Sequence, residues 1–67
     1  GTTPHRWLTR QRILLAQRLL ETTDLPIEDI AWRCGIGTGA NLRLQFAAAV
    51  RASPAAYRRT FTQNPAT

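Results

Sequence analysis

The chain has no lysine and no methionine, and it has only one histidine and one cysteine among its 67 residues. A single thiol, Cys34, cannot form an internal disulfide, so the sequence does not fit a small secreted scaffold. His5 and Cys34 fall on different predicted helices, and no carboxylate pair or metal-ligand spacing accompanies them. We therefore expect neither an enzyme nor a metal or cofactor site.

Long hydrophobic runs are also missing. The longest, ILLA at 13–16 and AAAV at 47–50, are far too short to cross a membrane, and no signal peptide is visible. We expect a cytoplasmic protein with no membrane partner. Because the chain opens without methionine, we also expect it to be an excised piece of a longer protein.

Negative charge is confined to one short segment. All nine basic residues are arginine, and the four acidic residues are Glu21, Asp24, Glu28 and Asp29, which gives a formal net charge of +5. Both flanks of the chain are therefore purely basic. Such asymmetry favours a polyanionic partner such as nucleic acid, although a solubilising surface would explain the charge alone equally well. The acidic segment itself is most simply a solvated face.

The clearest signals in the sequence are those for helix boundaries and for apolar residues at helical spacing. Thr3-Pro4 is a typical helix start, and a first helix is predicted over 4–22. The apolar residues expected at its helical spacing are Leu8, Leu15, Ala16, Leu19 and Leu20. A last helix over 54–62 begins the same way at Ser53-Pro54 and should turn Tyr57 and Phe61 inward. The tail over 63–67 should fray.

Two shorter helical patterns, separated by a glycine-rich corner, fill residues 27–50. The first carries an apolar stripe and should stop at Gly35 in a left-handed conformation, with Ile36 filling the corner. Thr38 is the expected N-cap of the second. The stripe of the first pattern is Ile27, Ile30, Ala31 and Cys34. The buried side of the second is Leu42, Phe46, Ala49 and Val50, and its outward side is Gly39, Ala40, Arg43, Leu44 and Ala47.

The sequence thus predicts an all-α fold, a small four-helix domain in which a helix-turn-helix packs on the long first helix. In that motif the second helix lies in the DNA major groove with its N-terminal residues at the base edges. Small residues at Gly37, Gly39 and Ala40 would let the backbone approach DNA closely. The alternative is a helical corner of an ordinary bundle, which is far commoner. The basic charge and Arg43 on the outward side favour DNA binding.

Four motifs in order give a specific resemblance. RILLAQRLL (12–20), IEDIAWRCGI (27–36), LRLQF (42–46) and RASPAAYR (51–58) resemble the carboxy-terminal DNA-binding region of AraC/XylS-family transcription regulators. The stretches GTGANLR and SPAAYRR are most similar to its GlxA-like branch. The resemblance implies two helix-turn-helix (homeodomain-like) units joined by a linker helix, which would be 4–22 here. Residues 1–3 would end a missing first unit, and an effector or dimerisation half would lie further upstream.

The same resemblance implies a recognition helix over about 38–50 that binds double-stranded DNA. The candidate DNA-binding residues are Thr38, Gly39, Ala40, Asn41, Arg43 and Leu44. Arg43 is the best candidate for a base contact, because arginine can pair in bidentate fashion with guanine, and a phosphate contact is the other interpretation. Arg51 replaces the customary glycine, so the turn before the last helix should be strained or altered.

A helical protein–protein interaction module is the alternative function. Trp32 lies off the apolar stripe, is expected to be exposed, and could dock a partner; family analogy also allows a contact with RNA polymerase. Trp7 is expected to be a core residue or to dock against the first unit. Arg12 and Arg58, both on family motif positions, are interpreted as structural residues that hold helix ends or acids.

Overall fold

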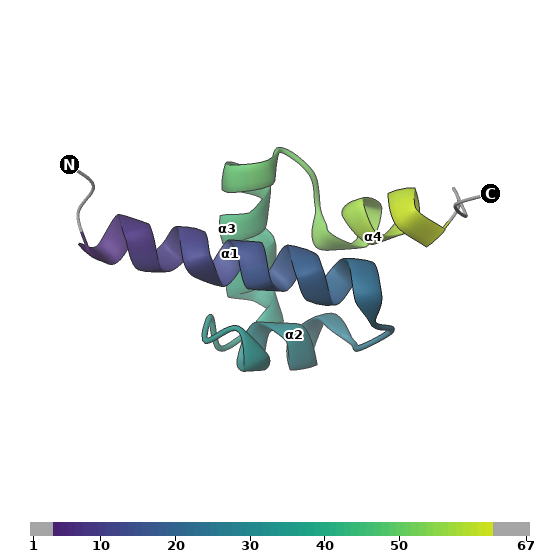
Figure 1. Ribbon diagram of the computed structural model, residues 1–67, viewed down its shortest axis with the longest axis horizontal. Coiled ribbons are helices and arrows are strands. Elements are labelled where there is room, and N and C mark those ends of the chain that lie inside the picture. The colour runs from purple at the N-terminus through teal and green to yellow at the C-terminus, as the bar shows by residue number, and fades with distance from the viewer. Residues whose placement is uncertain (1–3, 63–67) are drawn as a thin grey trace.

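The computed structural model describes residues 4–62 (Figure 1). It contains the helices α1 (Pro4–Thr22), α2 (Ile27–Arg33), α3 (Gly39–Val50) and α4 (Pro54–Thr62), and no strand occurs within these residues. The prediction of an all-α, four-helix fold is confirmed. The predicted Thr3 cap, the role given to residues 1–3 and the frayed tail over 63–67 lie outside the described residues.

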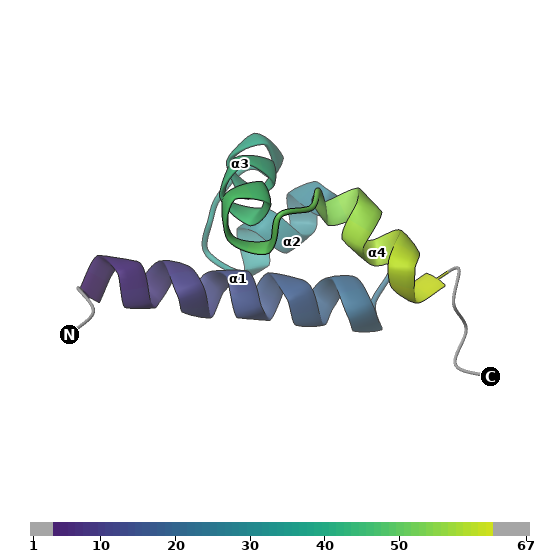
Figure 2. The same ribbon diagram turned by 90° about the horizontal axis from the view of Figure 1, so that it is seen from above.

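The long helix α1 is the base on which the other helices rest. Figure 2 shows α2, α3 and α4 all on one side of α1, and Figure 1 shows α3 running across α1. The N-terminal turns of α1 extend beyond the other three helices (Figure 1). The helix-turn-helix therefore packs against only part of α1.

One hydrophobic core joins α1, α2 and α3. Its buried members are Ile13, Ala16, Leu20, Ile30, Ala31, Cys34, Ile36, Leu42 and Phe46. Leu42 and Phe46, both in α3, have no exposed surface at all. Burying a side chain of this size contributes roughly 1.5–3 kcal/mol. Two such side chains one turn apart fix both the position and the rotation of α3.

The buried face of α1 differs in part from the predicted one. Leu8 and Leu15 are 40% and 42% exposed, so their predicted place in the core is wrong. Ile13 is buried instead, and it shares one face of the helix with Ala16 and Leu20 at spacings of three and four residues. Leu15 falls on a different face of α1, and Leu8 lies in the second turn of α1, before the first buried residue of that helix.

The corner between α2 and α3 is built as its residues predict. Gly35 has φ 86°, a left-handed conformation that glycine adopts without steric cost. The amides of Ile36 and Gly37 both donate to the carbonyl of Ala31 at 2.9 Å, which satisfies the end of α2. Ile36 is buried in the core. Both predictions for this corner are confirmed.

The N-termini of α3 and α4 have the predicted caps. The Thr38 hydroxyl accepts a hydrogen bond from the Asn41 amide at 3.1 Å, and the Ser53 hydroxyl accepts one from the Ala56 amide at 3.1 Å. Pro54 follows Ser53 in the first turn of α4 and is fully buried. Both helices therefore start where the sequence places a hydroxyl residue.

Aromatic side chains and one arginine fasten α4 to the rest of the fold. Tyr57 packs edge-on against Phe46, with ring centroids 5.4 Å apart. Phe61 packs against Tyr57 but remains 45% exposed, so its predicted inward position is wrong. Arg58 donates to the carbonyls of Thr23 at 3.1 Å and Leu20 at 3.5 Å. Its predicted structural role at a helix end, here that of α1, is confirmed.

Candidate nucleic-acid interface

The two sides of α3 differ sharply in burial. Leu42 and Phe46 face the core, whereas the other side is open to solvent. We call this open side the outer face of α3; its exposed residues are Ala40, Asn41, Arg43, Leu44 and Ala47. Ala40, Arg43, Leu44 and Ala47 follow at spacings of three and four residues, so they lie on one side of the helix.

Two predictions for α3 are wrong. Ala49, expected in the core, is exposed, because it lines an open groove beside α1 instead of contacting the centre of the fold. Gly39, expected to face outward, is buried. A Cβ at residue 39 would overlap the carboxylate of Glu28, with Glu28 Cδ only 2.8 Å away. The absence of a side chain at Gly39 therefore makes room for Glu28.

The segment leading into the outer face leaves its backbone accessible. Gly37 has φ 105°, is exposed, and has no atom beyond its own chain neighbours within 4 Å of the position a Cβ would take. Thr38 and Asn41 are exposed as well. The Thr38 oxygen accepts the Asn41 amide proton, and its hydroxyl proton remains able to donate to a ligand oxygen.

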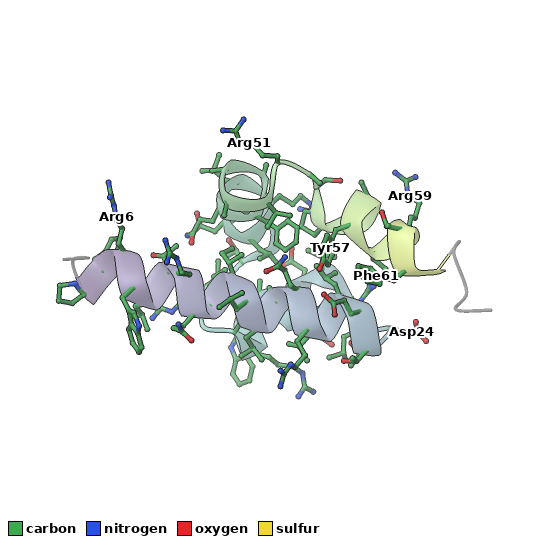
Figure 3. All side chains as sticks on the ribbon, turned by 45° about the horizontal axis from the view of Figure 1, so that its top comes forward. Arg6, Asp24, Arg51, Tyr57, Arg59 and Phe61 are labelled. Atoms are coloured by element: carbon green, nitrogen blue, oxygen red, sulfur yellow. The ribbon has the colours of Figure 1, made fainter. Side chains whose placement is uncertain are left out.

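Cationic side chains lie on the outer face of α3 and elsewhere on the side of the fold that faces away from α1. Arg43 is exposed in the second turn of α3. Arg51, directly after α3, and Arg59, on α4, are also exposed and point away from α1 (Figure 3). Asp24 lies by the end of α1, on the other side of the molecule (Figure 3). The side of the fold that carries α3 is therefore positively charged at three separate points.

Three of the exposed large apolar side chains bear on possible partners: Leu44, Trp32 and Trp7. Leu44 on the outer face of α3 is 71% exposed, and Trp32 on α2 is 77% exposed, as predicted for Trp32. Trp7 near the start of α1 is 56% exposed and is not part of the core formed by residues 4–62. Exposed apolar side chains of this size are commonly covered by a partner.

The remaining candidates for chemistry have structural surroundings. Burial raises the pKa of the Cys34 thiol above its ordinary value, which keeps it in the unreactive protonated form. Within residues 4–62, no three side chains of His, Cys, Asp or Glu gather as metal ligands would. None of the helices described has the length and apolar character that crossing a membrane requires.

The sequence interpretation missed Glu28 as a member of this surface. The sequence predicts Glu28 to belong, with the other acids, to a solvated face, yet its carboxylate covers Gly39 at the start of α3. The signal available in the sequence was Gly39 itself, since a glycine directly after an N-cap, where many residues would serve, suggests a close neighbour.

A short helix, a glycine corner and a second helix with one anchored and one open side define a helix-turn-helix domain. The chain belongs to the AraC-type helix-turn-helix family: the family model described as a helix-turn-helix domain matches residues 1–60. The family resemblance carried by the sequence motifs is confirmed.

Individual relatives agree with this family. The chain is 41% identical over 61 residues to the HTH-type transcriptional regulator Rv1931c of Mycobacterium tuberculosis, covering 91% of this chain and 24% of that protein. It is 51% identical over 37 residues to the transcriptional activator RhaS of Enterobacter sp. (strain 638), covering 55% of this chain and 13% of RhaS. The chain thus spans a quarter or less of these curated relatives.

One solved structure is similar over the whole chain. The DNA-binding domain of AdpA, a global transcriptional factor crystallised with a target DNA, superimposes with a TM-score of 0.91 at 43% sequence identity. The match covers 100% of this chain and 61% of the AdpA chain. The arrangement of α1 to α4 is therefore that of a domain whose crystal structure contains DNA.

Proposed function

We propose that this domain binds double-stranded DNA sequence-specifically as part of a bacterial transcription regulator, with α3 in the major groove. The observation that carries the proposal is the orientation of α3. Leu42 and Phe46 are completely buried and hold the helix, while Arg43 and Leu44 on its other side remain exposed. The similarity to the DNA-bound AdpA domain and to the regulators Rv1931c and RhaS supports it.

Each residue of the proposed interface has a definite task. Arg43 contacts a base edge, for which its planar guanidinium suits guanine. Leu44 meets an apolar group such as a thymine methyl, and Ala40 lets the helix approach closely. Thr38 and Asn41 hold backbone phosphates. Gly39, which is buried, contributes its backbone alone.

In the proposed parent protein, α1 links this domain to a preceding helix-turn-helix unit, and an effector or dimerisation half lies before that unit. The exposed Trp7 and Leu14 and a groove of about 700 Å³ between the first half of α1 and the end of α3 support the proposal of a preceding unit. A domain that acts on bacterial DNA works in the cytoplasm, and we propose no catalytic role for it.

A second candidate is a protein–protein interaction module, for example one that contacts RNA polymerase. The observation that favours it is Trp32, which is 77% exposed on α2. An apolar contact of this kind differs from DNA binding in its response to salt, because only the latter releases counterions from phosphates.

The experiment that separates the two measures affinity for fluorescent duplexes, chosen by selection from a random pool, at several salt concentrations. If the proposal holds, log Kd rises linearly with log salt, with a slope of about 0.9 for each phosphate contacted. Binding that does not respond to salt, or the absence of any binding between about 50 and 200 mM salt, would contradict the proposal.

A further inference from the structure

Glu28 and Arg43 approach the same glycine from the two helices of the helix-turn-helix. Glu28 lies in the first turn of α2 and Arg43 in the second turn of α3. A Cβ built on Gly39 would overlap Glu28 Oε2, and Arg43 Nη1 lies 3.5 Å from the same point. Gly39 is buried, whereas Glu28 and Arg43 are exposed. A carboxylate and a guanidinium therefore lie close together at the surface where DNA is proposed to bind.

This arrangement matters for orientation more than for stability. Pairs of exposed opposite charges add little to folding stability, because water and salt screen them. An exposed arginine, however, has many rotamers of similar energy, and a neighbouring negative charge favours those that keep the guanidinium beside it. Glu28 thus biases where the guanidinium of Arg43 is found before DNA arrives.

The same carboxylate acts differently on the two groups that DNA offers to Arg43. A guanidinium has five N–H donors, and a bidentate contact with guanine uses two, which leaves others free to face Glu28. A phosphate that approaches Arg43 brings its own negative charge toward the Glu28 carboxylate and is repelled. The carboxylate therefore penalises the phosphate contact and leaves the base contact possible.

We propose that Glu28 is a positioning residue that determines specificity: it directs Arg43 toward base edges and away from phosphates, and Gly39 provides the space for its carboxylate. This inference rests on the proposed DNA-binding function of α3. It adds to that function a residue outside α3, in the acidic segment of the chain.

The test compares Glu28→Gln with Asp29→Asn in the 67-residue chain. Both variants remove one negative charge from neighbouring exposed positions of α2, and Glu28 is the one that covers Gly39. Affinity is measured for a duplex selected by the unaltered chain and for a scrambled duplex, each over a series of salt concentrations.

Asp29→Asn should strengthen binding to both duplexes by the same factor. The ratio of the affinity for the selected duplex to that for the scrambled duplex should therefore stay unchanged. Glu28→Gln should strengthen binding to the scrambled duplex more than to the selected one, which lowers the ratio by a factor of about 5. Because Arg43 becomes available to phosphate, the salt slope on the scrambled duplex should also increase by about 1.

A third variant, Gly39→Ala, keeps the charge but pushes the carboxylate aside. It should lower the ratio of the two affinities as Glu28→Gln does, and the double variant should lower it no further, because both changes remove the Glu28 charge from beside Arg43. Circular dichroism melting of each variant confirms that the helices remain folded.

The outcomes distinguish this inference from the function on which it rests. If the unaltered chain prefers its selected duplex and Glu28→Gln behaves as Asp29→Asn does, Glu28 has no positioning role, and the proposed function stands. If the unaltered chain binds neither duplex, or both equally, the proposed function itself is contradicted.

Discussion

At the scale of single residues, Arg51 occupies an unfavourable backbone conformation. Its φ of 66° and ψ of 29° lie in the left-handed region, where residues with a side chain are uncommon. Its amide donates to the Ala47 carbonyl at 3.0 Å and so closes the end of α3. The turn keeps the left-handed shape that suits glycine, and Arg51 bears the steric cost, so the predicted strain in this turn is confirmed.

Replacing Arg51 with glycine should therefore stabilise the domain. We expect Arg51→Gly to raise the free energy of unfolding by about 1 kcal/mol, since it removes the clash of the Cβ with its own backbone. Urea denaturation followed by circular dichroism measures this. Arg51→Ala is the matched control, because it removes the same charge and keeps the Cβ. A gain from alanine as large as that from glycine would show that charge, not conformation, limits stability here.

Arg43 is the residue on which base recognition depends in this account. Arg43→Ala should weaken binding to the selected duplex by about 1–3 kcal/mol and weaken binding to a scrambled duplex much less. Fluorescence anisotropy with both duplexes measures the two losses. Arg18→Ala, which removes an equal charge from an exposed position of α1, is the control and should weaken both equally. Equal losses on both duplexes with Arg43→Ala would reduce Arg43 to a phosphate contact.

Residues whose role depends on near neighbours in the chain could be predicted, and those that depend on packing between helices could not. Thr38 caps α3 by accepting a hydrogen bond from the amide three residues further along, and Gly35 ends α2 in a left-handed conformation. Both roles can be recognised from local chemistry. The contact between Glu28 and Gly39 joins two helices, and its existence depends on how closely α2 and α3 pack. No spacing rule within one helix reveals it.

At the scale of helices, the contact between α1 and α4 depends on Tyr57. Its hydroxyl donates a hydrogen bond to the Glu21 carboxylate and accepts one from Gln17 Nε2 at 3.4 Å, both from α1. Its ring packs on Phe46 of α3. Tyr57 thus connects three helices and fixes α4 beside the helix-turn-helix (Figure 3).

Tyr57→Phe should keep the ring packing and lose the hydrogen bonds. We expect the free energy of unfolding at neutral pH to fall by about 1 kcal/mol. Burial, and then the hydrogen bond and charge of Glu21, raise the pKa of the Tyr57 phenol above its ordinary value of 10.0. The stabilisation is therefore complete below pH 10 and is lost as the pH rises through the higher pKa of the folded state.

The difference between the two proteins should shrink accordingly at alkaline pH. Thermal melting of the unaltered chain and of Tyr57→Phe at neutral pH and above pH 10 measures it. The phenylalanine variant has no phenol to ionise, so it is the control for all other groups that titrate in this range. A difference in Tm that stays constant from neutral pH to above pH 10 would mean that the hydrogen bond donated by the Tyr57 hydroxyl does not stabilise the fold.

Helix identities followed from the sequence more readily than helix faces. Caps, prolines and glycines fix where a chain can begin or end a helix, whatever it packs against. Which side becomes buried depends on the neighbours. Leu15 in α1 and Ala49 in α3 are apolar and helical but exposed, because no neighbouring helix covers the side of the helix on which each one lies.

At the scale of the whole molecule, the charge and the fold both favour the surface that carries α3 as the one that binds a polyanion. The other three helices lie on one side of α1 (Figure 2), and Arg51 and Arg59 point away from α1 (Figure 3). The net charge of +5 makes the chain attractive to polyanions before any contact forms. Composition alone could therefore suggest nucleic acid as a partner, whereas the surface involved required the packing of α3.

The most direct test follows the backbone amide signals of the chain by NMR while the selected duplex is added. We expect the largest shifts at residues 37–47, which include the corner and the outer face of α3. Amides in the first half of α1 should move least. Shifts confined to α1, or to the neighbours of Trp32 on α2, would contradict the claim that the outer face of α3 binds DNA.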